Sequence, residues 1–138
     1  MREHPLGSLV TTDDEGFPCV THLPLRLETL PGGAQRLLGH CARANPQWKH
    51  LLQRPMALVS FMGPHAYMSP KVYADLQRVP TWSYVAVQAR VRARVIEGEA
   101  AKDALLKHHR GPRTDLCRSV ACAARGLHRK NAQSHRGF

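Results

Sequence analysis

Residues 85–95 read Val-Ala-Val-Gln-Ala-Arg-Val-Arg-Ala-Arg-Val, and this stretch decides the fold class. Every odd-numbered position is Val or Ala, whereas Arg90, Arg92 and Arg94 occupy even-numbered positions. Side chains of a β-strand alternate between two faces. The pattern therefore predicts a long strand with an apolar inner face and an outer face that meets water or a ligand.

The neighbouring segments read as shorter strands separated by turn residues. We expect further strands at residues 6–12, 18–27, 35–40 and 56–62, with turns at 13–16, 31–33 and 63–64. Residues 65–69 can continue as strand after the last of these turns, until Pro70. The strand at 18–27 should bury its odd-numbered face. One helix is expected from Asn45 to Gln53, and the composition of residues 97–109 is typical of another. These elements predict a mainly β (α+β) fold, a small antiparallel barrel with one or two peripheral helices.

Residues 39–48, Gly-His-Cys-Ala-Arg-Ala-Asn-Pro-Gln-Trp, join a strand to the expected helix. Asn45 is a favoured N-cap, and Pro46 fits the first helical position because its missing N–H is not needed there. Helix N-termini bind phosphate groups, and Arg43 adds a positive charge beside this one. An ordinary strand-to-helix corner is the alternative interpretation.

Three other segments carry more polar or aromatic groups than a bare barrel needs. They are Thr-His-Leu-Pro-Leu at 21–25, Phe-Met-Gly-Pro-His-Ala-Tyr-Met-Ser-Pro at 61–70, and Val-Pro-Thr-Trp-Ser-Tyr at 79–84. An indole and a phenol can pack against a flat ring ligand, although packing against the core would use them equally well. Taken singly, each segment also fits a purely structural role.

Taken together and in this order, the four segments resemble the PaiB-like FMN-binding negative transcriptional regulator family of bacteria. Met68 stands where that family has Ile, and Ser83 where it has Asn. The resemblance covers residues 6–97 and implies a split β-barrel like that of the pyridoxamine-phosphate oxidases. It also implies non-covalent FMN at a homodimer interface and a role in repressing transcription.

The resemblance and the general needs of a flavin together suggest a set of cofactor-binding residues. They are Thr21, His22, Leu23, His40, Arg43, Asn45, Trp82 and Tyr84. The first three would lie along the ring or ribityl chain, and the next three would anchor the phosphate. The two aromatic residues would close the site, in one arrangement from the partner subunit. No catalytic residue and no metal ligand is predicted.

The expected domain organisation is a split-barrel FMN-binding domain at 1–107 and a basic, irregular tail at 108–138. Compared with the family, the chain begins almost at the first strand, and the match stops near Lys107. The segment after Lys107 has no clear period and almost no acidic residue, which is typical of a solvated, disordered tail. We interpret it as a tail read out of the ancestral frame or a decayed gene end.

The formal net charge of +10 is concentrated toward this end of the chain, since residues 102–138 hold nine Lys or Arg and two acidic residues. A nucleic-acid-binding module that uses the tail and the arginine row is therefore an alternative function, and DNA a candidate partner. A zinc site at Cys117 and Cys122, with His128 and either His108 or His109, is a weaker alternative. A haem-handling protein using His22, His40 and His65, and a degenerate fragment without activity, complete the alternatives.

The remaining expectations concern location and chemistry. No apolar run approaches a membrane span and no signal peptide is visible, so we expect a cytoplasmic protein with no membrane partner. The four cysteines should then be reduced thiols. No acid–base pair or activated nucleophile is recognisable, which favours a non-enzyme. If the protein is an enzyme, an FMN-dependent oxidoreductase is expected.

Overall fold

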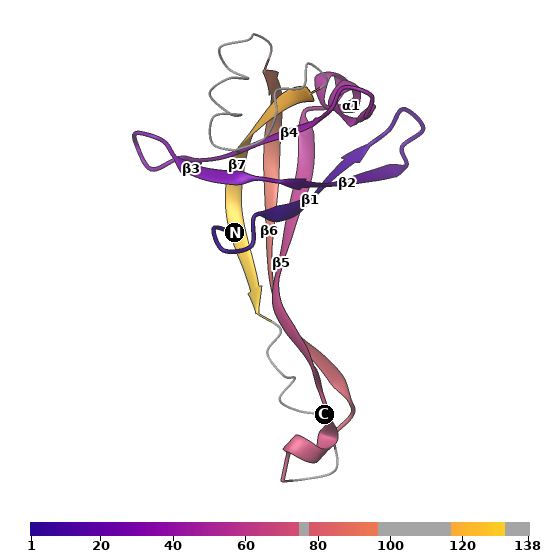
Figure 1. The fold of residues 1–138 in the computed structure, drawn as a ribbon, viewed down its shortest axis with the longest axis vertical. Helices are drawn as coiled ribbons and strands as arrows, with labels where there is room; N and C mark the ends of the chain where they lie inside the picture. The colour runs from indigo at the N-terminus through magenta and orange to yellow at the C-terminus, as the bar shows by residue number, and fades with distance from the viewer. Residues whose placement is uncertain (75–77, 97–116, 132–138) are drawn as a thin grey trace.

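The structure is a computed structural model of the 138-residue chain that describes residues 1–74, 78–96 and 117–131. These residues form seven strands, one α-helix and one 3-10 helix (Figure 1). In chain order they are β1 (Leu6–Thr12), β2 (Pro18–Pro24), β3 (Arg26–Thr29), β4 (Gln35–Ala42), α1 (Gln47–Gln53), β5 (Met56–Met68), η1 (Pro70–Val72), β6 (Thr81–Ile96) and β7 (Cys117–Asn131).

The strands form one antiparallel sheet in the order β2-β1-β5-β6-β7-β4-β3. Its two edge strands, β2 and β3, follow each other directly in the chain and are separated only by Leu25. The sheet must therefore curl until the end of β2 reaches the start of β3, although no ladder pairs these two strands. This closure makes a small barrel and confirms the predicted split-barrel fold.

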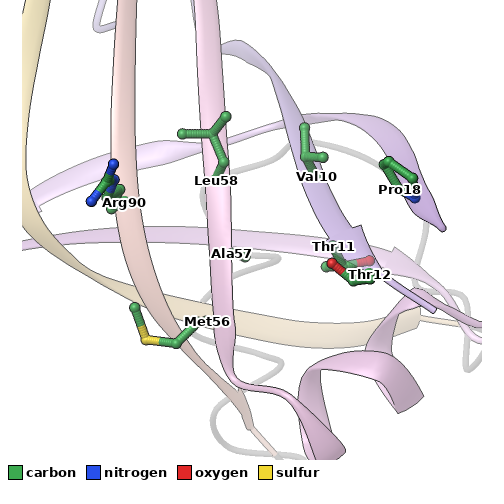
Figure 2. Close-up of a pocket in the computed structure, with 8 residues that line it drawn as sticks. All are labelled: Val10, Thr11, Thr12, Pro18, Met56, Ala57, Leu58 and Arg90. Carbon is green, nitrogen blue, oxygen red and sulfur yellow. The ribbon is translucent and has the colours of Figure 1, made fainter. Parts of the chain in front are cut away.

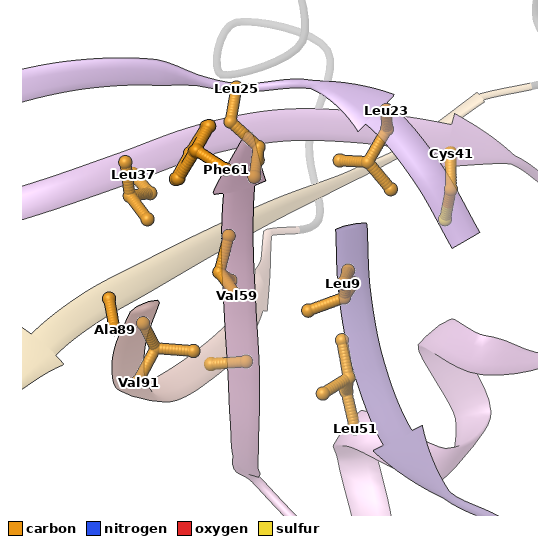
Figure 3. Close-up of a cluster of buried hydrophobic side chains, with 11 residues drawn as sticks. Leu9, Leu23, Leu25, Leu37, Cys41, Leu51, Val59, Phe61, Ala89 and Val91 are labelled. Atoms are coloured by element: carbon orange, nitrogen blue, oxygen red, sulfur yellow. The ribbon is translucent and has the colours of Figure 1, made fainter. Parts of the chain in front are cut away.

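The core fills the inside of this barrel (Figure 3). Val59 on β5 and Ala89 and Val91 on β6 are fully buried, as the alternation along the predicted strands requires. The buried residues of the cluster are Leu9, Leu23, Leu25, Leu37, Cys41, Leu51, Val59, Phe61, Ala89, Val91 and Ala93. Leu51 comes from α1, so this helix contributes to the core at one end of the barrel.

One glycine is required by the way the chain crosses over itself. A Cβ atom added to Gly39 on β4 would lie 2.6 Å from Leu25 Cδ2 and 2.8 Å from Leu23 Cδ1. The segment from β2 to β3 therefore packs directly onto the β4 backbone. A side chain at position 39 would push the two layers apart.

Most of the predicted elements are confirmed, and three details differ. The strand expected at 18–27 breaks at Leu25, because the chain leaves the β2 edge there and starts the β3 edge. The expected turn at Gly63-Pro64 does not end β5, which continues to Met68 after a shift in its pairing with β6. The helix expected from Asn45 begins at Gln47. Its buried residues are Gln47 and Leu51, whereas Leu52 is 57% exposed.

The tail differs more strongly from its prediction. Residues 117–131 form β7, which pairs with β6 on one side and β4 on the other. The irregular tail expected at 108–138 is therefore wrong for this part. The segment has a mixed Ala, Arg and Cys composition and little period of its own, so its pairing is supplied by the two strands beside it. The domain boundary at 107 and the helix at 97–109 lie outside the described residues.

Candidate functional site

A hydrogen-bonded corner joins the edge strand β2 to the start of α1. Asn45 Nδ2 donates to Thr21 Oγ1 at 2.9 Å, and Asn45 Oδ1 accepts from the backbone N–H of Gln47 at 2.9 Å. Asn45 therefore accepts from the N–H of the first residue of α1, but the N-cap position itself is occupied by Pro46, one residue later than predicted. One side chain holds both a strand and a helix start, so the segments at 21–25 and 39–48 lie against each other.

Gln47 and Trp48 make further hydrogen bonds at the start of α1. Gln47 is 2% exposed, and its Nε2 donates to the backbone oxygens of Leu9 and Cys19 at 2.9 Å each. Trp48 Nε1 donates to the backbone oxygen of Arg43 at 3.0 Å. The Gln47 bonds attach the start of α1 to the barrel strands, and the Trp48 bond closes the turn at 43–46 onto the helix.

The corner is electropositive. Arg43 is exposed in the turn before α1, and His40 is half-buried near the end of β4. Residues 16–27 and 35–54 include five Arg or Lys, but Arg26 and Arg36 pair with Glu28, and Arg54 pairs with Asp14. An anionic group at this corner would therefore meet the positive charge of Arg43 and Lys49.

The helix N-terminus offers less to an anion than the sequence suggests. Pro46 has no N–H, and the N–H of Gln47 is already bonded to Asn45. The helix is also only 7 residues long, so its dipole is small. A phosphate anchor at this corner would depend mainly on side chains, above all on Arg43.

The other two predicted cofactor-binding residues of β2, His22 and Leu23, point in opposite directions. His22 is exposed, and its Nδ1 lies 2.9 Å from Ser8 Oγ on the neighbouring strand β1. Leu23 is 4% exposed and belongs to the core. A ligand along β2 could reach the His22 side chain, whereas Leu23 could offer it only backbone atoms.

The two predicted aromatic residues, Trp82 and Tyr84, do not lie at the corner. Trp82 and Tyr84 belong to the first part of β6, which extends with the end of β5 far beyond the rest of the sheet (Figure 1). Trp82 precedes the buried Ala89 by seven positions, or roughly 23 Å along the strand. Within one chain, the structure therefore brings together the predicted residues of the corner but not these two.

Several residues that contact the predicted site were missed by sequence reasoning. Ser8 pairs with His22, Gln47 anchors α1, and His65 and Tyr67 lie beside Trp82. His65 and Tyr67 could have been found only from the strand register, which places Tyr67 opposite Trp82. It could not be read from the sequence because the shift between Met62 and His65 changes the pairing.

A shallow groove of about 270 Å³ lies on the outer face of the sheet (Figure 2). Its lining residues are Val10, Thr11, Thr12, Pro18, Met56, Ala57, Leu58 and Arg90. None of the predicted cofactor-binding residues is among them. Arg90 is exposed there, as predicted for the arginine row of β6.

Two further expectations concern cysteines and metals. Cys19 and Cys41 form no disulfide bond in the part of the chain that the structure describes. The described residues contain no group of three His, Cys, Asp or Glu side chains that could hold a metal ion. The zinc alternative involves positions whose side chains lie outside the described part. In the same part, no helix is long and apolar enough to cross a membrane.

Comparison with known proteins points to a flavin family. The family described as "Putative FMN-binding domain" matches residues 1–111. The Bacillus subtilis "Protease synthase and sporulation protein PAI 2" is 37% identical over 105 residues, which cover 76% of this chain and 49% of that protein. The chain thus spans about half the length of this curated relative.

Solved structures give the same fold at low sequence identity. A Listeria innocua protein titled "Putative Pyridoxamine 5'-phosphate oxidase" aligns with a TM-score of 0.63 and 15% identity, over 95% of this chain and 92% of that one. The "FAD and Heme binding protein" of Mycobacterium smegmatis aligns with a TM-score of 0.69 and 14% identity, over 98% and 69%. These likenesses confirm a split barrel of the pyridoxamine-phosphate-oxidase type.

Proposed function

Because this chain belongs to the FMN-binding domain family, we propose that it binds FMN non-covalently at the interface of a homodimer. The corner between β2 and α1 would hold the phosphate and ribityl chain. The observation that carries the proposal is the bond between Asn45 Nδ2 and Thr21 Oγ1, which joins the two segments where Arg43 and His22 are exposed.

The residues at the corner fit the chemistry of FMN. A phosphate dianion needs positive charge and hydrogen-bond donors, and Arg43 supplies both through a planar guanidinium. His40 and Thr21 lie on the strands that border the same corner. When bound, FMN would supply a redox-active ring, and this chain would bind and orient it.

The proposed dimer is supported by the separation between the corner and the two aromatic residues within one chain. Trp82 and Tyr84 cannot cover the corner of their own chain without a large movement of the long strands β5 and β6. A second copy could bring them to it. The arrangement would be a symmetric pair of sites, each built from the corner of one copy and the aromatic residues of the other.

The regulatory role is the finer part of the proposal. We propose that the flavin-bound dimer acts as a negative regulator of transcription, as the PaiB-like motifs imply. The relation to a protein named for protease synthesis and sporulation supports a regulatory rather than a metabolic role. A cytoplasmic location belongs to the same proposal.

Binding of FMN is tested by purification, spectroscopy and titration. We expect the purified protein to carry a flavin absorption spectrum, or to acquire one on addition of FMN, and to have the solution mass of a dimer. A colourless protein that does not bind added FMN would overturn the proposal. A flavin-binding monomer would overturn only its interface.

A second candidate, nucleic-acid binding through the arginine row, is favoured by one observation. Arg90, Arg92 and Arg94 are all exposed on β6. Binding through phosphates should weaken steeply as the salt concentration rises. If DNA binding is detected, falls with salt and is lost when the three arginines are changed to Ser while FMN binding persists, this surface contacts DNA directly.

A further inference from the structure

Four aromatic rings share one face at the far end of the long hairpin. Here "the arm" means residues 63–68 of β5 and 81–84 of β6. In the register of this pair, His65 lies opposite Tyr84 and Tyr67 lies opposite Trp82. Residues directly opposite each other, and residues two apart on one strand, point to the same side. All four rings therefore face one way.

Trp82 is held in place by two of its neighbours on this face. Its indole Nε1 donates to His65 Nδ1 at 3.2 Å, and the two ring centroids are 5.7 Å apart. The centroid of Tyr67 is 6.1 Å from that of Trp82, with the ring planes at 53°. These are favourable distances for aromatic pairs. The contacts restrict the orientation of Trp82 although its side chain is 52% exposed.

The arm stands apart from the remaining strands of the described chain. β1 pairs with β5 only at residues 58–61, and β7 pairs with β6 only from Val85 onward. Figure 1 shows the two arm strands running together away from the barrel. A two-stranded ribbon is only marginally stable in water. Tyr67 and Trp82 are each more than half exposed, so burial of this aromatic face would stabilise the arm.

We propose that His65, Tyr67, Trp82 and Tyr84 form one stacking platform that covers the flavin ring held at the corner of a second copy. In this platform, His65 and Tyr67 are positioning residues, which fix the orientation of Trp82. The inference rests on the proposed function, because it takes FMN at the corner as its starting point. It adds His65 and Tyr67 to the site and identifies the flavin ring of a second copy as the group that the arm binds.

The chemistry of the aromatic platform and of the flavin ring supports this assignment. A flavin ring is flat and apolar on its faces, as is the indole of Trp82, and stacking uses those faces on both sides. The described arm residues contain no Asp or Glu, so the platform would not repel a phosphate-bearing ligand. The corner supplies the charge that the arm lacks.

Flavin fluorescence of the bound cofactor separates stacking from mere stability, because a stacked indole quenches a flavin at contact. Four forms are compared: wild type, Trp82→Leu, His65→Phe, and Ala66→Ser as a control on the opposite face of the arm. We expect quenched flavin in wild type and control. Trp82→Leu should weaken FMN binding by about 5- to 100-fold and restore the fluorescence of the flavin that binds.

His65→Phe tests the positioning role. It keeps a ring but removes the acceptor for the Trp82 indole, so we expect a smaller loss of affinity and a partial recovery of flavin fluorescence. If His65→Phe matches the Ala66→Ser control in both FMN affinity and flavin fluorescence, His65 does not position Trp82. If Trp82→Leu also matches, the platform is overturned while FMN binding stands. If wild type binds no FMN, both proposals fail.

Mixing two defective chains shows which copy supplies the platform and does not depend on the folding of a single variant. Arg43→Gln damages the corner, and Trp82→Leu damages the arm. In a mixed dimer one site joins the intact corner of one copy to the intact arm of the other. We expect co-refolded chains to regain about a quarter of the quenched, tightly bound flavin of wild type. No recovery would overturn an arm that acts across the interface.

Discussion

Asn45 and Thr21 are 24 residues apart in the sequence, and the 2.9 Å bond from Asn45 Nδ2 to Thr21 Oγ1 joins them at one end of the barrel. β2 is an edge strand that pairs only with β1 in the described sheet, so this bond holds it from the side that has no partner strand. Replacing Thr21 with Val keeps the shape and removes the acceptor. We expect Thr21→Val to lower the free energy of unfolding by about 1 kcal/mol in urea denaturation.

Thr11→Val is the matched control for this change. Thr11 is 3% exposed, and its Oγ1 has no hydrogen-bond partner among the described residues. Removing an unpaired buried hydroxyl should leave stability unchanged or raise it. Equal losses for the two variants would show that the Asn45 bond contributes nothing specific.

Much of the fold was predictable because its signals are local. The alternation at 85–95 and the apolar run at 56–62 were sufficient to place the two central strands, and Asn45-Pro46 placed the helix start within two residues. The bond from Asn45 to Thr21 was not predictable. It depends on how the sheet closes, which no local pattern describes.

β7 and the arm show the opposite case. Residues 117–131 have little strand pattern of their own, and their place in the sheet comes from pairing with β4 and β6. Gly63-Pro64 reads as a turn, yet the strand passes through it with a shifted register. In both places long-range pairing overrides local preference, so the sequence predicted an irregular tail and a turn at Gly63-Pro64.

Gln47 should be essential for the attachment of α1. Its Nε2 is bonded to the backbone oxygens of Leu9 and Cys19, so Gln47→Met removes a buried donor shared by two carbonyls. We expect a loss of about 1–3 kcal/mol in the free energy of unfolding. Gln53→Met, at the exposed end of the same helix, should change it little. Similar losses from both would contradict a specific role for Gln47.

Gly39→Ala should be costly because its Cβ would collide with the leucines that cross above β4. The nearest atom is Leu25 Cδ2 at 2.6 Å. We expect a loss of about 1–3 kcal/mol by thermal or urea denaturation. In a Leu25→Ala background the extra cost of Gly39→Ala should shrink, since the closest obstacle is gone. Simple additivity of the two changes would argue against the predicted collision.

Glu28 should make stability depend on pH. Burial raises the pKa of its carboxyl, but the guanidiniums of Arg36 and Arg26 lower it by more, so the pKa lies below its ordinary value of 4.5. Arg36 Nη2 is 2.6 Å from Glu28 Oε2, and Arg26 contacts the other carboxylate oxygen. A lowered pKa in the folded state means that the ionised form stabilises the fold.

This stabilisation is fully present above the ordinary carboxyl pKa and disappears as the pH falls through the lowered pKa of the folded state. We expect the free energy of unfolding of wild type to exceed that of Glu28→Gln by about 0.5–1 kcal/mol at pH 7. This difference should vanish in strong acid. Denaturation at a series of pH values measures it. A difference independent of pH would exclude an ionic role for Glu28.

Arg43 should discriminate FMN from riboflavin if it binds the phosphate. Its guanidinium is the exposed cation nearest in sequence to the Asn45 corner, and charge-assisted bonds of this kind contribute about 1.5–3 kcal/mol. Arg43→Gln should therefore weaken FMN binding by about 10- to 150-fold and leave riboflavin binding almost unchanged. Arg54→Gln is the control, since Arg54 is already paired with Asp14 at 2.6 Å. If Arg43→Gln weakened both ligands equally, Arg43 would shape the corner without contacting the phosphate.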